Sequence, residues 1–483
     1  MLTQLSISNF KAFSKKHDLN LSPITLIYGP NSSGKSSIIQ SLMLLKQSLS
    51  SPGEYGGLVS HGELVDLGTY SSMVNGHDVD HNIGFSVEFN APENLKRAVG
   101  HYSMFGRKHK RRATLDYQIF SDSQKCKNTF TFLTSANFSV YLADKAKKSI
   151  PYKFGFSSKL NDPISLKDNA NLVELSRQFE LDSEESLKDF VRLLNSRSNS
   201  SDNKTRTALN NLIFSSDVGF STPSSVKVKD EKGGAELHSY TLEYAMANAI
   251  VGSFSTELHE KFRDITYLGP LRSYPSRLYA PNGDVSGGVG KLGEHAAYLL
   301  HEKPSICESI NHWFEEFQIP YILSTENIGN DVTGTVISIQ LKDTRTGVTV
   351  GPSDVGFGIG QLLPILVEGL VRNDCTICVE QPEIHLHPKL QANLADFFID
   401  TVNPEDERRN QWLVETHSES LILRLQKRVR EKRIDPSDIS IIYVEPTTKG
   451  ASVLHLQLDE DGDFIDEWPD GFFDDRLDEI FGS

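Results

Sequence analysis

The sequence has little cysteine and no long apolar run. Only four of its 483 residues are cysteine, too few for a disulfide-rich secreted fold. No apolar stretch approaches the roughly 18 residues that a membrane-spanning helix needs, and the opening residues MLTQLSISNF do not resemble an export signal. We therefore expect a cytoplasmic protein that contacts no membrane.

Positive charge is also scarce. The chain has 49 Lys and Arg residues against 64 Asp and Glu, a formal net charge of −15, which excludes a surface that is basic throughout. Any contact with nucleic acid must therefore be local. A composition of 38% hydrophobic and 23% charged residues is typical of a globular protein, and the length allows two or three structural units.

The pattern of apolar residues predicts an α/β fold built from the two ends of the chain. Near the N-terminus it predicts a strand over Leu2–Phe13, a buried strand over Ile24–Tyr28 and a helix over Ser37–Leu49. Near the C-terminus, short apolar runs predict buried strands over Thr376–Val379 and Gln411–Glu415. Helices of this part are predicted over Gly293–His301, Ser305–Phe317, Gln361–Val371, Pro388–Ile399 and Ser418–Glu431. Further strands are predicted over Val336–Leu341, Val348–Val350 and Ile439–Val444, with a hairpin turn at Asp459–Asp463.

The middle of the chain is less regular. Apolar and polar residues alternate as in strands over Ile83–Phe89, Thr114–Phe120, Thr129–Leu133 and Phe138–Leu142. A long helix is predicted over Thr241–Phe262. The middle is therefore predicted to be a mixed β and helical insertion between the two α/β parts.

A phosphate-binding loop is predicted directly after the buried N-terminal strand. Gly29 to Ser36, GPNSSGKS, fits the pattern G-x-x-x-x-G-K-[ST] between a strand and a helix. In such loops backbone N–H groups face the phosphates, the lysine reaches the β and γ oxygens, and the last hydroxyl binds Mg²⁺. The sequence thus predicts ATP and Mg²⁺ as cofactors, with GTP left open. The candidate binding residues are Gly29, Asn31, Ser33, Gly34, Lys35, Ser36 and Ser37.

The segment TICVEQPEIHLHP supplies the acids of the predicted site. Glu380 ends a hydrophobic strand, as an acid that holds Mg²⁺ beside Ser36 would. The next residue, Gln381, can orient water but cannot accept its proton, which predicts slow hydrolysis. Glu383 has two interpretations that the sequence leaves open: a substitute base, or a cap near the positive end of the following helix.

The order of these motifs resembles the ABC-type ATPase heads of SMC and RecF proteins. A glycine-rich segment, DVGFGIGQ, precedes Glu380, and His417 follows in VETHSES. The resemblance implies that Phe357–Gln361 replaces the signature motif, that Gly358, Gly360 and Gln361 cap the γ-phosphate on a second subunit, and that His417 is the switch histidine. It further implies at least a homodimer with ATP between two heads. Gly358 stands where the signature has serine, which predicts a weaker contact across the dimer.

A closer resemblance is to predicted ATPases of prokaryotic anti-phage systems, of the Septu and retron-associated PtuA type and the overcoming-lysogenization-defect type. It is carried by EQPEIHLHP, YLGPLRSYPSR (Tyr267 to Arg277), GKLGEHAAYLL (Gly290 to Leu300) and the tail FIDEWPDGFFDDRLDEIF. It implies an ATPase head formed by residues 1–95 and 261–483, with 96–260 as an insertion that contacts a partner. It also implies a separate effector, such as a nuclease. A nuclease domain of the TOPRIM type needs about a hundred residues, and 38 follow Glu445.

Two alternative functions remain open. The basic run Arg107–Arg112 can neutralise phosphates, with His101, Tyr102 and Phe105 available for stacking on bases, or it can form a solvated loop. The first interpretation favours a RecF-like ATPase that binds DNA in repair. The second alternative is a near-inactive ATP sensor, which the glutamine at position 381 favours.

Overall fold

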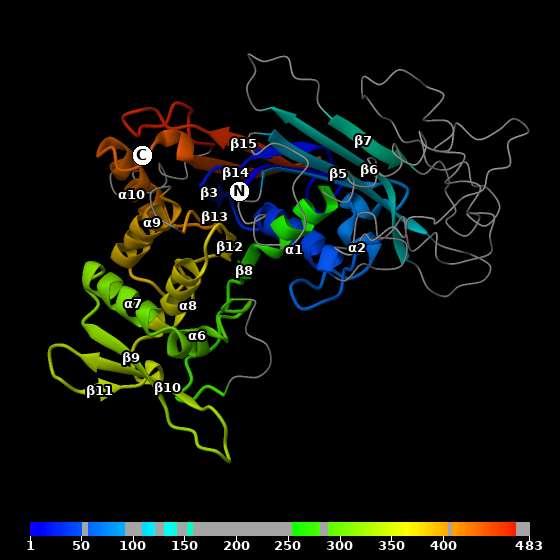
Figure 1. Cartoon of the computed structure of the whole chain (residues 1–483). Coiled ribbons are helices and arrows are strands. Elements are labelled where there is room, and N and C mark those ends of the chain that lie inside the picture. Colours follow the sequence, from blue (N-terminus) through cyan, green and yellow to red (C-terminus); the bar gives the residue numbers. More distant parts are fainter. Residues whose placement is uncertain are drawn as a thin grey trace, which may run out of the picture. The chain divides into compact units, whose positions relative to one another are not determined.

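The computed structural model describes residues 1–50, 57–91, 109–120, 130–142, 152–157, 254–280, 288–403 and 408–469 (Figure 1). The chain divides into two compact units. Unit 1 consists of Met1, Leu19–Ile39 and Asp264–Ser483, and unit 2 consists of Leu2–Asp18 and Gln40–Arg263. Within the described ranges, no helix combines the length and the apolar character that crossing a membrane demands.

Unit 1 is built on a six-stranded sheet in the order β15-β14-β3-β13-β12-β8. The strands are β3 (Ile24–Tyr28), β8 (Ile265–Leu268), β12 (Thr376–Glu380), β13 (Gln411–Glu415), β14 (Ile439–Thr447) and β15 (Gly450–Leu456). All neighbours are parallel except β14 and β15. Every residue of β3, β12 and β13 is buried, which explains their unbroken apolar sequences. Because parallel strands end at the same edge, the residues after β3, β12 and β13 meet there.

Helices and a small second sheet complete unit 1. The helices are α6 (Ala296–Glu302), α7 (Pro304–Glu316), α8 (Phe357–Val371), α9 (Pro388–Val402) and α10 (Glu419–Arg430), with short 3-10 turns at Pro352–Asp354 and Pro436–Asp438. Helix α1 (Lys35–Ser50) begins in unit 1. The second sheet has the order β11-β10-β9, from β9 (Tyr321–Asn327), β10 (Ile337–Asp343) and β11 (Thr349–Val350).

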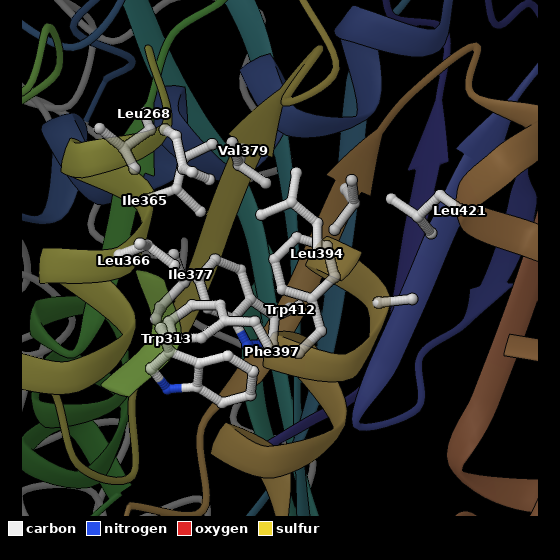
Figure 2. Close-up of a cluster of buried hydrophobic side chains, with 14 of the residues drawn as sticks. Leu268, Trp313, Ile365, Leu366, Ile377, Val379, Leu394, Phe397, Trp412 and Leu421 are labelled. Atoms are coloured by element: carbon white, nitrogen blue, oxygen red, sulfur yellow. The ribbon is translucent and has the colours of Figure 1, made fainter. Parts of the chain in front are cut away.

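The core of unit 1 lies between the large sheet and its helices, around Trp412 of β13 (Figure 2). The Trp412 ring lies 4.5 Å from Phe398 and 6.0 Å from Phe397 of α9, measured between ring centroids. Trp313 of α7 meets Phe397 edge-on at 5.2 Å. The buried indole N–H of Trp412 donates to the Thr401 hydroxyl at 2.8 Å, so this polar group is satisfied inside the core.

Unit 2 contains a six-stranded sheet in the order β2-β1-β4-β5-β6-β7. Its strands are β1 (Leu2–Ser8), β2 (His17–Asn20), β4 (Ile83–Asn90), β5 (His109–Phe120), β6 (Phe130–Leu142) and β7 (Tyr152–Ser157); β2 ends in unit 1. Strands β1, β4, β5, β6 and β7 pair antiparallel. Residues 254–263 are helical, and Phe254 packs against Phe89 and Phe138 of the sheet, at centroid distances of 6.1 and 4.8 Å. Short turns of helix lie at α2 (Tyr70–Met73) and η2 (Asn75–His77).

The structure confirms the α/β class and corrects several element boundaries. The strand predicted over Leu2–Phe13 ends at Ser8, because Asn9 and Lys11 have left-handed φ angles of 52° and 48°. The two strands predicted over 129–133 and 138–142 are one strand, β6. The helix predicted from Gln361 begins four residues earlier, at Phe357. The predicted helix over 241–262 lies outside the described residues up to position 253.

The interpretation of the basic run as a solvated loop is wrong for its described residues. Lys110, Arg111 and Arg112 lie on β5, where alternation turns Arg111 into the interior with no exposed side-chain surface. Its Nε donates to Glu257 at 2.5 Å. Lys110 and Arg112 both pair with Glu88, at 2.9 and 2.6 Å. Three of the cations therefore have carboxylate partners within unit 2; Arg107 and Lys108 lie outside the described residues.

This pairing predicts that Arg111→Met destabilises unit 2. Removing one partner of a buried ion pair takes this pairing away from the other buried charge, which typically costs about 3–5 kcal/mol. Urea unfolding should show this loss, and Arg111→Met combined with Glu257→Leu should recover most of it, since both charges are then absent. Lys110→Met, at a side chain that is 29% exposed, is the control with a small effect. A loss in Arg111→Met no larger than in this control would contradict the prediction.

Candidate nucleotide-binding site

The loop from Gly29 to Lys35 joins β3 to α1 in a conformation that requires glycine. Gly29 has a φ of 143°, and a Cβ there would lie 2.1 Å from the carbonyl oxygen of Val444. Gly34 has a φ of 107°. Ser33 is buried, and its hydroxyl has no hydrogen-bond partner among the described residues, so it remains available to a ligand. Of the other predicted residues, Asn31 is exposed in the loop and Ser37 is buried in the first turn of α1.

Lys35 is folded back over this loop. Its ammonium group donates to the carbonyl oxygens of Gly29 and Pro30, at 2.9 and 2.8 Å. The residue is 4% exposed, and burial lowers the pKa of Lys35 while the nearby Glu415 opposes that shift. The loop thus holds a buried cation against its own backbone, within the segment that the pattern assigns to phosphate binding.

Two carboxylates meet at the sheet edge beside the loop. Glu380 ends β12 and Glu415 ends β13, and the parallel register places them opposite each other. The Ser36 hydroxyl donates to Glu415 Oε1 at 2.9 Å. Glu380 instead accepts from the Tyr267 hydroxyl of β8, also at 2.9 Å. The structure therefore pairs Ser36 with Glu415 rather than with Glu380; Glu415 was predicted as the end of a strand and not as a site residue.

The chemistry of this group fits a magnesium ion. Mg²⁺ prefers oxygen ligands, and Ser36, Glu380 and Glu415 present a hydroxyl and two carboxylates. Glu415 Oε2 is buried without a hydrogen-bond partner in the described part of the chain. Burial, with a further contribution from the charge of Glu415, raises the pKa of Glu380 to about 7. Burial likewise raises the pKa of Glu415. These two acids repel each other when ionised, so a cation between them would stabilise both charges.

Glu383 faces the end of β13 and does not cap a helix. Its Oε2 accepts from the Thr416 hydroxyl and its Oε1 accepts from the His417 backbone N–H, each at 2.7 Å. The N-cap of α9 is His387, whose ring accepts from the Lys389 N–H. The interpretation as a cap of the following helix is therefore wrong, and the role of Glu383 as a base stays a prediction.

Gln381 makes a sharp turn between these acids. Its φ of 46° is left-handed, and its N–H donates to the Glu415 carbonyl at 2.7 Å. Its side-chain amide forms no hydrogen bond with the residues that the structure describes. His417 is half-buried, and burial and the charge of Lys35 both lower the pKa of its imidazole. The predicted catalytic residues Glu380, Gln381, Glu383 and His417 therefore lie at one sheet edge.

Sequence comparison assigns most of the chain to one family. Residues 1–422 match the family model described as the AAA ATPase domain. The chain belongs to this family of ATPases. Residues 434–481 match a second model, described as a protein of unknown function (DUF3696). No curated protein matches the sequence.

The structure of this ATPase is distantly similar to solved SMC heads. One is the SMC head bound to the C-winged helix domain of ScpA (11% identity, 95% of this chain and 98% of that chain, TM-score 0.42). Another is the SMC head domain from Thermotoga maritima (11% identity, 95% of this chain and 99% of that chain, TM-score 0.35). A third is the SMC head domain from Pyrococcus furiosus bound to the C-terminal domain of ScpA (12% identity, 94% of this chain and 96% of that chain, TM-score 0.39). With TM-scores below 0.5, these likenesses add nothing to the family assignment.

The segment Phe357–Gln361 forms the first turn of α8 in this ATPase. A Cβ at Gly358 would lie 2.8 Å from the His385 carbonyl oxygen, and one at Gly360 would lie 2.3 Å from Pro275 Cγ, so close packing explains both glycines. Gln361 is 1% exposed, and its amide nitrogen has no hydrogen-bond partner in the described ranges. No hydrogen bond joins this turn to the phosphate loop of the same chain among the described residues.

The raised pKa of Glu380 predicts a pH-dependent stability of the ATPase without Mg²⁺. The folded chain binds this proton more tightly than the unfolded chain, so folding loses stability as pH rises from about 4.5 to about 7. Glu380→Gln removes that loss and should gain about 3 kcal/mol on the parent over this interval. Urea unfolding at a series of pH values measures the difference. A difference between the two proteins that does not change with pH would contradict the prediction.

Proposed function

We propose that this ATPase binds ATP with Mg²⁺ between two copies of itself, hydrolyses it slowly, and thereby controls a separate effector, a nuclease of prokaryotic anti-phage defence. The observation that carries the nucleotide half is the contact of Ser36 with Glu415 at 2.9 Å, beside Glu380 and next to the phosphate loop. Loop, hydroxyl and carboxylates together are the parts that a P-loop ATPase needs.

The residues divide into three roles in this proposal. The loop N–H groups, Ser33 and Lys35 bind the phosphates. Ser36, Glu380 and Glu415 hold Mg²⁺, which when bound neutralises charge on the β- and γ-phosphates. Glu383 accepts the proton of the attacking water, and Gln381 and His417 orient that water. A buried carboxylate is suited to this task because burial raises the pKa of Glu383 above its usual value.

The dimer is supported by the first turn of α8. Its N-cap, Gly356, has no side chain to cap the helix, and the N–H groups of Phe357 and Gly358 have no hydrogen-bond partner among the described residues, so they can face a phosphate. The Ile359 N–H donates to the Gly356 carbonyl at 3.3 Å. Phe357, Gly358 and Gly360 are only partly buried. We therefore assign this turn to the nucleotide bound by the second copy. ATP with Mg²⁺ should convert monomer to dimer in light-scattering measurements, and persistence of the monomer at saturating ATP would contradict this assignment.

The effector half is supported by the likeness of EQPEIHLHP and YLGPLRSYPSR to ATPases of anti-phage systems. The insertion over 96–260 is the part that we assign to partner contact. The test is copurification of the chain with the product of its neighbouring gene, followed by nuclease assays with and without ATP. A chain that purifies alone and cleaves DNA unaided would overturn this half and leave the ATPase assignment unaffected.

An ATP sensor that scarcely hydrolyses is the second candidate. It is favoured by Gln381, whose amide cannot accept a proton and stands directly after Glu380. The RecF-like alternative has lost part of its support, because Lys110, Arg111 and Arg112 already pair with carboxylates of unit 2. ATP-stimulated DNA binding that is lost on neutralising Arg107 and Lys108 would restore it.

A further inference from the structure

Arg272 is a buried cation without a carboxylate hydrogen bond in the described part of the chain. It follows β8 and is 5% exposed. Its guanidinium donates to two successive backbone carbonyls, that of Glu380 at 2.8 Å and that of Gln381 at 3.0 Å. Its Nε has no hydrogen-bond partner among the described residues. Burial of such a charge is costly, so its retention calls for a role.

The two carbonyls belong to the turn that separates Glu380 from Glu383. Gln381 is left-handed there, a conformation that costs a non-glycine residue about 1 kcal/mol or more. The turn is held from both sides, because the Gln381 N–H donates to the Glu415 carbonyl while its own carbonyl accepts from Arg272. Because both its N–H and its carbonyl are hydrogen-bonded, Gln381 keeps a fixed backbone conformation, and this sets the path of the residues that follow it.

That direction determines where Glu383 lies. Two residues after the clamped turn, its carboxylate reaches the Thr416 hydroxyl and the His417 N–H, at 2.7 Å each. The charge of Arg272 also compensates the acids at longer range, since Glu383 and Glu380 both act to raise the pKa of Arg272 against the lowering by burial. Geometry and charge therefore connect Arg272 to Glu383 without a direct hydrogen bond.

We propose that Arg272 is a positioning residue for ATP hydrolysis: by clamping the Glu380 and Gln381 carbonyls it holds the turn that places Glu383 against the attacking water. This inference rests on the proposed role of Glu383 as base. It assigns Arg272 no contact with phosphate. A change at Arg272 should therefore lower the rate of the chemical step and leave ATP affinity nearly unchanged.

The test is a double-mutant cycle between Arg272 and Glu383 in the full chain. Arg272→Met should lower single-turnover hydrolysis about 10- to 100-fold while the Kd for ATP changes less than about threefold, because a misplaced catalytic group costs rate rather than binding. Arg272→Lys should retain an intermediate rate, since an ammonium group can donate to one carbonyl. In a Glu383→Gln background, Arg272→Met should have almost no further effect, because residues that act as one unit are not additive. Arg345→Met, at a side chain that is 64% exposed and paired with Asp343, is the control for unchanged rate and affinity.

Three results would overturn the inference. The first is a double variant whose rate loss equals the product of the rate losses of Arg272→Met and Glu383→Gln. The second is a loss of ATP affinity in Arg272→Met as large as its loss of rate. The third is a parent chain that binds ATP but does not hydrolyse it in a single turnover. A parent that binds no ATP would instead refute the proposed function itself. If Arg272→Met does not fold, Arg272→Lys completes the same cycle.

Discussion

Lys35→Met is expected to abolish measurable ATP hydrolysis and to weaken ATP binding about 100-fold or more. Each hydrogen bond to a charged group contributes about 1.5–3 kcal/mol, and 1.4 kcal/mol corresponds to a factor of ten in affinity. One ammonium group that contacts β and γ oxygens can make two such bonds. Methionine keeps the apolar stem and removes the charge. Calorimetric titration with ATP and a phosphate-release assay measure the two effects.

The position of Lys35 gives the physical reason. The ammonium group now donates to the carbonyls of Gly29 and Pro30. Burial lowers the pKa of Lys35, so its charged form gains more from an incoming anion than an exposed lysine would. Lys427→Met on α10, at a side chain that is 59% exposed, is the matched control. Equal ATP affinity in the two variants would show that the loop does not bind phosphate through Lys35.

Local sequence was sufficient for three central strands of unit 1 and the phosphate loop, but it did not predict β8, β9 or β15. Strands β3 and β13 have the predicted bounds, because fully buried parallel strands leave unbroken apolar runs that end sharply at polar residues. Strand β12 extends the predicted range by one residue, Glu380. The phosphate loop was visible because its glycines, lysine and serine act within eight consecutive residues.

The partners of this loop were harder to predict because they depend on register between distant segments. Glu415 meets Ser36 only because β13 lies beside β3 and in register with β12. Its signal in the sequence was an acid that ends a buried strand, the same pattern that identified Glu380. Tyr267 and Arg272 had no such pattern, since one donates from β8 and the other binds backbone carbonyls.

The basic run shows a different limit of sequence reasoning. Five cations within six consecutive residues resemble a solvated patch, yet alternation on β5 turns Arg111 inward to Glu257, a residue 146 positions away. The density of positive charge in the sequence therefore did not indicate which of these side chains are exposed to solvent. The partners of Lys110 and Arg112 also come from another strand, β4, through Glu88.

Glu383→Gln is expected to lower single-turnover ATP hydrolysis by about 10² to 10⁴, the usual contribution of a positioned general base. ATP affinity should stay within a few-fold of the parent, because Glu383 contacts Thr416 and His417 rather than the phosphate loop. Quenched-flow measurement of ADP formation, with a separate binding titration, distinguishes the two effects. Glu368→Gln is the control for loss of a buried acid, since Glu368 is 1% exposed and pairs with Arg372 on α8.

Gln381 supplies the complementary experiment. Gln381→Glu places a carboxylate directly after Glu380, and combined with Glu383→Gln it should restore part of the lost rate if water can be activated from either position. A parent that hydrolyses bound ATP at a rate unaffected by Glu383→Gln would show that another group takes the proton. A parent with negligible hydrolysis would favour the ATP sensor, in which bound ATP holds the dimer in one state. The buried carboxylate of Glu383 favours slow hydrolysis over none, because it is a third acid at the sheet edge, beside the proposed magnesium ligands Glu380 and Glu415, and a carboxylate can accept a proton from water.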